Sequence, residues 1–208
     1  MDSLFSMNRF GRICFITNSD GADDAVYKAL KAGIRWIQYR EKERSKRDIY
    51  FKASMLREIT RSFDACLMVN DYADIALAVD ADGVHLGQKD LPLKEARKIM
   101  GARIIGISTH NLEEAVEAEE NGADYIGFGS IFNTTTKQDA YVQGLQPLAN
   151  ISRYIKIPVI AIGGININNL MSVLNAGCYG AAVSSGLIAG DIEENVKNFL
   201  SIAREAKK

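Results

Sequence analysis

One pattern recurs along the chain and restricts its fold more than any other feature: an amphipathic helical segment, a glycine, then a short apolar segment. It is clearest at Gly33 before 34–38, at Gly122 before 124–128 and at Gly177 before 180–183. Glycine suits the position after a last helical turn because it adopts positive φ without strain. The apolar segments are nearly continuous, which is typical of parallel strands covered on both faces. The pattern therefore predicts repeated β/α units.

Eight apolar segments fit this description, with helical patterns between them. The predicted strands are 13–17, 35–40, 66–69, 82–85, 104–107, 124–128, 158–162 and 179–183. A chain of 208 residues with three prolines and no linker-like stretch suits one barrel, since such barrels commonly run as one unit of about 200–250 residues. We predict an α/β fold, a single (β/α)8 TIM barrel over 1–208. A doubly wound open sheet is less favoured because no GxGxxG follows the first strand.

Two of the predicted helices begin with a recognisable cap. Asn111 precedes an apolar face and has Glu114 three residues on, a spacing that favours a side-chain N-cap. That face comprises Leu112, Ala115, Val116 and Ala118. The last helix begins at Asp191 in the same way, and its expected buried stripe consists of Ile192, Val196, Phe199, Leu200 and Ala203.

Charge and cysteine content limit the partners and the compartment. The formal net charge of −1 argues against a nucleic-acid surface or a polybasic membrane patch. No apolar run reaches the length of about 18 residues that spans a membrane, and no signal peptide is evident. Cys14, Cys66 and Cys178 are far apart and form no CxxC pair, so we interpret them as small buried hydrophobes in a reducing compartment. We expect a cytoplasmic protein; assembly into a homo-oligomer stays open.

In such a barrel, functional groups gather at the carboxyl ends of the strands. The second strand runs into Gln38-Tyr39-Arg40-Glu41-Lys42. Because side chains alternate along a strand, Gln38, Arg40 and Lys42 share the inner face with Trp36, while Ile37 and Tyr39 face the helices. Two cations at a barrel mouth suit a diphosphate or carboxylate. The alternative is a solvated charge run, which is the better interpretation for Arg44, Lys46 and Arg47.

Carboxylates follow the next two strands. Asn70 and Asp71 come after the third strand, and Gln88 and Asp90 after the fourth. Carboxylates beside an anion-binding face suit Mg²⁺, which takes few protein oxygens and completes its shell with water and substrate phosphates. Taken singly, Asp71 could cap a helix and Asp90 could begin a turn. Their pairing opposite Arg40 favours the metal.

The remaining strand ends carry hydroxyls and glycines. Ser108 follows the fifth strand, and no nucleophile elbow or triad order surrounds it or the two histidines, His85 and His110; we interpret both histidines as non-catalytic, His85 as a hydrogen-bonded barrel residue. The longest loop, 129–139, carries three threonines and a lysine that could donate to phosphate oxygens, unless it is a bland polar loop.

The seventh strand ends in Gly163-Gly164 and the eighth in Ser184-Ser185-Gly186. Loops at these two positions frequently form a backbone phosphate site in such barrels. The mouth would thus hold two anion sites, one cationic with a metal and one built from backbone N–H groups. That arrangement suits the joining of two phosphorylated small molecules with diphosphate as the leaving group.

Several segments together resemble the thiamine phosphate synthase family over nearly the whole chain. They are 38–42, Asn70-Asp71, the stretch ADGVHLGQKD at 81–90, Gly106-Ile107-Ser108, Thr134-Thr135-Thr136-Lys137 and 161–165. The resemblance implies a transferase that condenses hydroxymethylpyrimidine diphosphate with thiazole phosphate, releasing diphosphate. It also implies a dissociative route assisted by Mg²⁺, in which a pyrimidine cation is captured by the thiazole nitrogen.

The resemblance also implies roles for individual residues. It places the pyrimidine diphosphate on Gln38, Tyr39, Arg40, Glu41, Lys42 and Asn70, the Mg²⁺ on Asp71 and Asp90, the pyrimidine amine on Ser108, the diphosphate on Lys137, and the thiazole phosphate on Thr134, Thr135, Thr136, Gly164, Ser184 and Ser185. Arg40, Ser108 and Lys137 would be the catalytic residues. A side chain at Gly164 would intrude on the phosphate, so Gly164→Val is expected to impair thiazole phosphate binding while leaving thermal stability near normal.

Two positions depart from the family pattern, and three other functions compete. Asn133 replaces a usual proline, and Ser184 a usual isoleucine, so only the backbone contact of Ser184 transfers. A thiazole tautomerase of the same family would lack the Thr-x-Thr-Lys loop and carry a histidine near position 130, which is serine here. A sugar-phosphate isomerase or epimerase would not explain Asp71 and Asp90 beside Arg40. A non-catalytic phosphate binder would not need them either.

Overall fold

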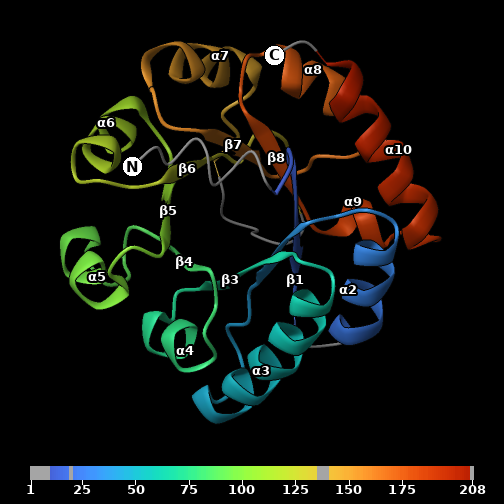
Figure 1. Cartoon of the computed structure of the whole chain (residues 1–208). Helices are drawn as coiled ribbons and strands as arrows, with labels where there is room; N and C mark the ends of the chain where they lie inside the picture. Colours follow the sequence, from blue (N-terminus) through green and yellow to red (C-terminus); the bar gives the residue numbers. More distant parts are fainter. Residues whose placement is uncertain (1–9, 19–20, 135–140, 207–208) are drawn as a thin grey trace.

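A computed structural model describes residues 10–18, 21–134 and 141–206, and its strands close into a parallel barrel in the order β1 to β8. Figure 1 shows the strands at the centre and the helices around them. The strands are β1 Ile13–Thr17, β2 Trp36–Tyr39, β3 Cys66–Asn70, β4 Gly83–Leu86, β5 Ile104–Thr109, β6 Tyr125–Phe128, β7 Val159–Ile162 and β8 Gly180–Val183. All eight predicted strands are present, with their ends shifted by two residues or fewer. The predicted (β/α)8 barrel is confirmed.

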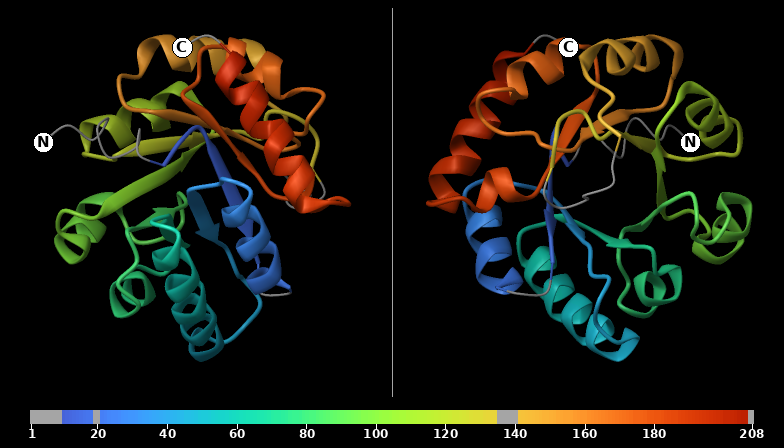
Figure 2. Two further views of the ribbon diagram at one scale, coloured as in Figure 1. Left: turned by 45° about the vertical axis from the view of Figure 1, so that its right-hand side comes forward. Right: turned by 180° about the vertical axis from the view of Figure 1, so that it is seen from behind.

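Helices follow the strands and form an outer ring, which is visible from both directions in Figure 2. They are α2 Ala22–Lys31, α3 Lys46–Ser62, α4 Ala73–Ala78, α5 Leu93–Met100, α6 Leu112–Glu120, α7 Leu145–Tyr154, α8 Leu170–Asn175, α9 Ser185–Ile188 and α10 Ile192–Glu205. None of these described helices is long and apolar enough to cross a membrane.

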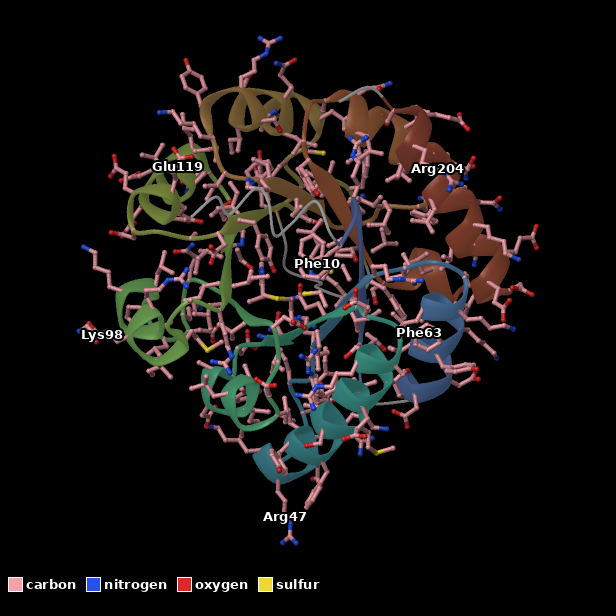
Figure 3. All side chains as sticks on the ribbon, viewed as in Figure 1. Phe10, Arg47, Phe63, Lys98, Glu119 and Arg204 are labelled. Atoms are coloured by element: carbon pink, nitrogen blue, oxygen red, sulfur yellow. The ribbon has the colours of Figure 1, made fainter. Side chains whose placement is uncertain are left out.

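The apolar residues form two separate layers, as the alternation along β2 predicts. Trp36 belongs to the cluster inside the barrel, whereas Ile37 and Tyr39 belong to the layer between strands and helices. Phe10 packs into the inner cluster ahead of β1 and lies near the middle of the ring in Figure 3, while Arg47 points away from it. The three cysteines are buried and free, as expected.

The two predicted caps are present, but one predicted buried face is partly wrong. Asn111 Oδ1 accepts a hydrogen bond from the Glu114 N–H at 2.8 Å, and Asp191 caps α10 in the same way. On α6, however, Leu112 and Val116 are exposed, and only the alanines of the predicted face are buried. The small alanines let the helix lie close to the strands, so the larger residues beside them remain at the edge of the contact.

The amino-terminal end of the barrel is held by half-buried carboxylates. Asp124 Oδ2 accepts the backbone N–H of Ile105 at 2.8 Å and the guanidinium of Arg97 at 2.6 Å. Asp82, just before β4, likewise accepts a backbone N–H of β3 and the guanidinium of an arginine in α3. Each carboxylate thereby joins a strand, its neighbouring strand and a covering helix. Polar contacts on this face of a barrel serve stability, since the chemistry lies at the opposite face.

We expect Asp124→Ala to lower the free energy of unfolding by about 2–4 kcal/mol, because the strand N–H loses its acceptor and the half-buried guanidinium of Arg97 loses its carboxylate partner, keeping only backbone carbonyls. Glu95→Ala is the matched control, since its pair with Lys98 is exposed, and exposed pairs contribute about 1 kcal/mol or less. Urea unfolding of both variants tests this. Equal losses would show that Asp124 is an ordinary surface charge.

Candidate active site

A cavity of about 420 Å³ opens at the carboxyl ends of the strands. Every strand or the loop after it contributes to its wall, which includes Ile16, Gln38, Arg40, Lys42, Asn70, Asp71, His85, Asp90, Ser108, Ser130, Thr134, Gly164, Ser184 and Ser185. Most of the residues predicted to bind substrate or metal are therefore brought together in one cavity, as parallel strands of a closed barrel require.

The residues after β2 divide between the cavity and the outer layer. Gln38, Arg40 and Lys42 line the cavity. Tyr39 is 1% exposed and packs in the outer layer. Glu41 accepts hydrogen bonds from the N–H groups of Lys42 and Glu43 at 2.8 and 2.9 Å. The side chains of Tyr39 and Glu41 thus shape this loop, and neither residue is among those that line the cavity.

Arg40 supplies positive charge that no described side chain neutralises. Its guanidinium has no salt bridge or hydrogen bond to a side chain within the described part of the chain, although it lines the cavity. Nearby, Gln38 Nε2 donates to Asn70 Oδ1 at 2.7 Å, which orients both buried amides. An unpaired cation beside oriented amides is suited to an anionic ligand with hydrogen-bonding groups.

The predicted metal ligands, Asp71 and Asp90, lie side by side at the cavity wall. Asp71 adopts φ 67°, a left-handed conformation that aspartate tolerates better than most residues, and it does not cap α4. Its carboxylate contacts Lys42 Nζ at 3.1 Å. Burial and a side-chain hydrogen bond with Asp90 raise the pKa of Asp71, while Lys42 acts in the opposite direction.

Asp90 begins the turn after β4 and also lies beside the other predicted metal ligand. Its Oδ2 accepts the Gly87 N–H at 2.6 Å, so it does stabilise the turn after β4. It also lies beside Asp71. No group of three or more His, Cys, Asp or Glu side chains gathers at a possible metal site in the described residues. The raised pKa of Asp71 shows that the two neighbouring carboxylates lack sufficient positive charge around them. A cation that completes its shell with water and phosphate oxygens would supply that charge.

The two histidines are both held by hydrogen bonds. His85 Nε2 lies 2.9 Å from Ser108 Oγ, and its Nδ1 lies 2.9 Å from the Tyr125 hydroxyl. Burial lowers the pKa of His85 to about 4, so the imidazole is neutral at neutral pH. His110 pairs with Glu114 instead, at 2.9 Å. The prediction that His85 is a hydrogen-bonded barrel residue is confirmed, but His85 also lines the cavity.

The part of the cavity wall that follows β7 and β8 includes two glycines and two serines. Gly163 and Gly164 after β7 lie beside Ser184 and Ser185 after β8. No described carbonyl accepts a hydrogen bond from the N–H of Gly164 or Ser185, so these groups are available to a phosphate. Thr134 also lines the cavity. Thr135, Thr136 and Lys137 lie outside the described residues, so their predicted contacts stay predictions.

Sequence reasoning missed Tyr125 and the contribution of Gln88. Tyr125 opens β6 within an apolar run and has the appearance of a core residue, yet its hydroxyl reaches His85. Gln88 Nε2 donates to the Ser108 carbonyl at 2.6 Å and thereby holds the end of β5. Only the register between strands could have revealed Tyr125, because His85 and Tyr125 each pair with Gly106.

The fold and the cavity define a class: a (β/α)8-barrel enzyme whose mouth binds phosphorylated small molecules. Comparison with known proteins identifies the family. The sequence pattern described as "Thiamine monophosphate synthase" matches residues 13–187, most of the chain. The chain belongs to the thiamine monophosphate synthase family.

Individual relatives support the same assignment. The thiamine-phosphate synthases of Clostridium acetobutylicum and Pyrococcus furiosus are 45% and 46% identical to this chain over 183 residues, covering 87% and 88% of both chains. The solved thiamine phosphate pyrophosphorylase from Pyrococcus furiosus superimposes with a TM-score of 0.90 at 41% identity, over 97% of this chain and 100% of that one. The activity is therefore thiamine-phosphate synthesis, a transferase reaction on small phosphorylated substrates, and not that of the three rivals.

The geometry at Gly164 corrects one expectation, that Gly164→Val would leave stability near normal. Gly164 has φ 64°, and an added Cβ would lie 2.4 Å from the Asn133 carbonyl oxygen. We expect even Gly164→Ala to destabilise the protein by about 2–3 kcal/mol, because it combines backbone strain with overpacking. Ser185→Ala is the control on the same wall, since alanine is tolerated in a helix. Thermal unfolding of both compares them; equal melting temperatures would refute the clash.

Proposed function

We propose that the chain joins 4-amino-2-methyl-5-hydroxymethylpyrimidine diphosphate to 4-methyl-5-hydroxyethylthiazole phosphate by a dissociative substitution assisted by Mg²⁺. The observation that carries this proposal is the Arg40 guanidinium, which has no counter-ion among the described residues, in one cavity with two adjacent carboxylates and a backbone wall after β7 and β8. The first group of residues suits a diphosphate with a metal, and the wall suits a monophosphate. The family's biosynthetic activity and the free, buried cysteines support a cytoplasmic location.

Asp71 and Asp90 would hold the Mg²⁺. When bound, the ion supplies positive charge to the diphosphate oxygens. Lys42 pairs with Asp71 here. A diphosphate on the ion held by Asp71 would therefore lie within reach of the Lys42 ammonium. Arg40, which lines the same cavity, would bind the same anion. Because their positive charge is fixed before the reaction, these residues stabilise the departing diphosphate more than the intact substrate.

The substitution requires no general base. The bond between the pyrimidine methylene carbon and the diphosphate oxygen breaks, and its electron pair leaves with diphosphate. The thiazole nitrogen lone pair then forms the new carbon–nitrogen bond, and no proton is transferred. Both ring nitrogens of His85 and the Nδ1 of His110 already have hydrogen-bond partners, which agrees with a scheme that assigns neither histidine the role of a base. Exclusion of water from the cavity when both substrates are bound would protect the pyrimidine cation from capture by water.

The remaining residues position the two rings. Gln38 and Asn70 contact the pyrimidine diphosphate, and Ser108 contacts the aminopyrimidine. The backbone N–H groups of Gly164 and Ser185 bind the thiazole phosphate, with Ser184 contributing through its backbone and Thr134 from the loop after β6. Support comes from the position of all these residues in one cavity wall.

The first test of this scheme concerns the metal. Chelation of divalent ions should abolish turnover, and added Mg²⁺ should restore it. Asp90→Asn should raise the Mg²⁺ concentration needed for half-maximal rate by about tenfold or more, since outer contacts alone commonly change metal affinity by 10–100-fold. Asp74→Asn, at an exposed carboxylate on α4, is the control. Full activity in excess chelator, with no metal retained, would refute the metal assignment.

The second test concerns Lys137, predicted from sequence to bind the departing diphosphate. An interaction that strengthens in the transition state by about 3 kcal/mol gives a loss in kcat of roughly 100-fold for Lys137→Ala. Lys46→Ala, which removes an exposed lysine of the charge run, should leave kcat unchanged. A raised KM with normal kcat in Lys137→Ala would instead make Lys137 a ground-state binding residue.

A further inference from the structure

Three side chains from three neighbouring strands form one continuous series of hydrogen bonds inside the barrel. The Tyr125 hydroxyl lies 2.9 Å from His85 Nδ1, and His85 Nε2 lies 2.9 Å from Ser108 Oγ. Their strands β6, β4 and β5 are consecutive in the barrel (Figure 1). His85 and Tyr125 both stand in register with Gly106 of β5, so the two rings meet across that strand.

Two glycines provide the space for this series. A Cβ on Gly106 would lie 2.1 Å from Cζ of Tyr125, and a Cβ on Gly127 would lie 3.1 Å from Cε1 of His85. The Tyr125 ring is held on another side by Trp36, with ring centroids 5.2 Å apart in an edge contact. The phenol therefore has one available position, and its hydroxyl points to His85.

The direction of the hydrogen bonds follows from counting protons. Burial raises the pKa of Tyr125, so the phenol keeps its proton, and the neutral imidazole carries one. If Nδ1 carried that proton, Tyr125 would accept from it and would need another acceptor for its own hydrogen. Among the described residues, none other than His85 Nδ1 accepts from the Tyr125 hydroxyl. A buried donor without an acceptor is costly, so Tyr125 donates to Nδ1.

We propose that Tyr125 fixes His85 as the Nε2–H tautomer, so that His85 donates to Ser108 and the Ser108 hydroxyl points its own hydrogen into the cavity. Ser108 Oγ then offers a ligand one O–H donor and one remaining lone pair. This pair matches an amino group next to a ring nitrogen, which offers one donor and one acceptor. The opposite tautomer would leave Ser108 only as an acceptor. Tyr125 and His85 are thus positioning residues for recognition of the aminopyrimidine, which rests on the proposed function.

The tautomer can be measured without substrate. The chain has two histidines, so isotope-labelled histidine gives two imidazole patterns in a long-range hydrogen–nitrogen correlation spectrum, and His110→Gln identifies which belongs to His85. We expect protonated Nε2 and bare Nδ1 in the intact protein. Tyr125→Phe keeps the ring between Trp36 and Gly106 but removes the donor, and should convert His85 to a mixture of tautomers. Protonated Nδ1 in the intact protein, or an unchanged pattern in Tyr125→Phe, would overturn the proposal.

Kinetics test the consequence for recognition. Tyr125→Phe should lower kcat/KM for the pyrimidine diphosphate by about tenfold, in the range of a discriminating hydrogen bond, with the KM for thiazole phosphate within about twofold of its original value. Ser108→Ala in the Tyr125→Phe background should cost less than Ser108→Ala alone, because the two changes act through one series of bonds. Tyr27→Phe, at an exposed ring on α2, is the control. Additive losses, or equal effects on both substrates, would count against the proposal.

Failure of the two ideas can be told apart. The expected tautomer together with no turnover of these substrates would refute the proposed reaction and leave the hydrogen-bond series intact. Turnover together with protonated Nδ1 would refute the series and leave the reaction intact.

Discussion

The interior of a closed eight-stranded barrel has a fixed volume, and the site depends on how that volume is shared. Large aromatic side chains on some strands leave room only for glycine on the neighbouring strands. Trp36 and Tyr125 pack in the interior, and the Tyr125 ring occupies the space that a side chain at position 106 would fill. The same holds for His85 and position 127. Close packing of this kind leaves few alternative positions for a side chain. The polar side chains that contact this interior on the cavity side are therefore held in defined orientations.

A polar layer lies directly on this packed interior. Gln38, Asn70, His85 and Ser108 are held by hydrogen bonds to one another or to the layer below. Preorganised groups lose little freedom when a ligand binds, and this is how enzymes stabilise developing charge without rearranging. Arg40 differs from them because the described chain offers it no counter-ion. The site therefore combines polar groups of fixed orientation with positive charge that suits an anionic ligand, as the proposed function requires.

The carboxylates show how local backbone geometry serves the same end. Asp71 adopts a positive φ at the end of β3, and its N–H bonds the His85 carbonyl at 2.8 Å. The bend turns the carboxylate toward Asp90 and Lys42 instead of toward the helix that follows. Strained residues of this kind are maintained only where the surroundings specify them, and they gather at functional sites. The turn at Gly87–Asp90 supplies the second carboxylate from the neighbouring strand.

The sequence alone determined the strands, the barrel and the inner face of β2, because hydrophobic period and helix-ending glycines are local signals that every β/α unit repeats. It also indicated Arg40, Lys42, Asp71 and Asp90, since residues after parallel strands must meet at one end of the barrel. Tertiary structure alone decided that Glu41 bonds the N–H groups of its own loop, that Leu112 and Val116 stay exposed, and that Gly164 is confined by Asn133. It alone joined Tyr125 to His85. These outcomes depend on register and on distances between segments far apart in the chain, and no local pattern of residues carries that information.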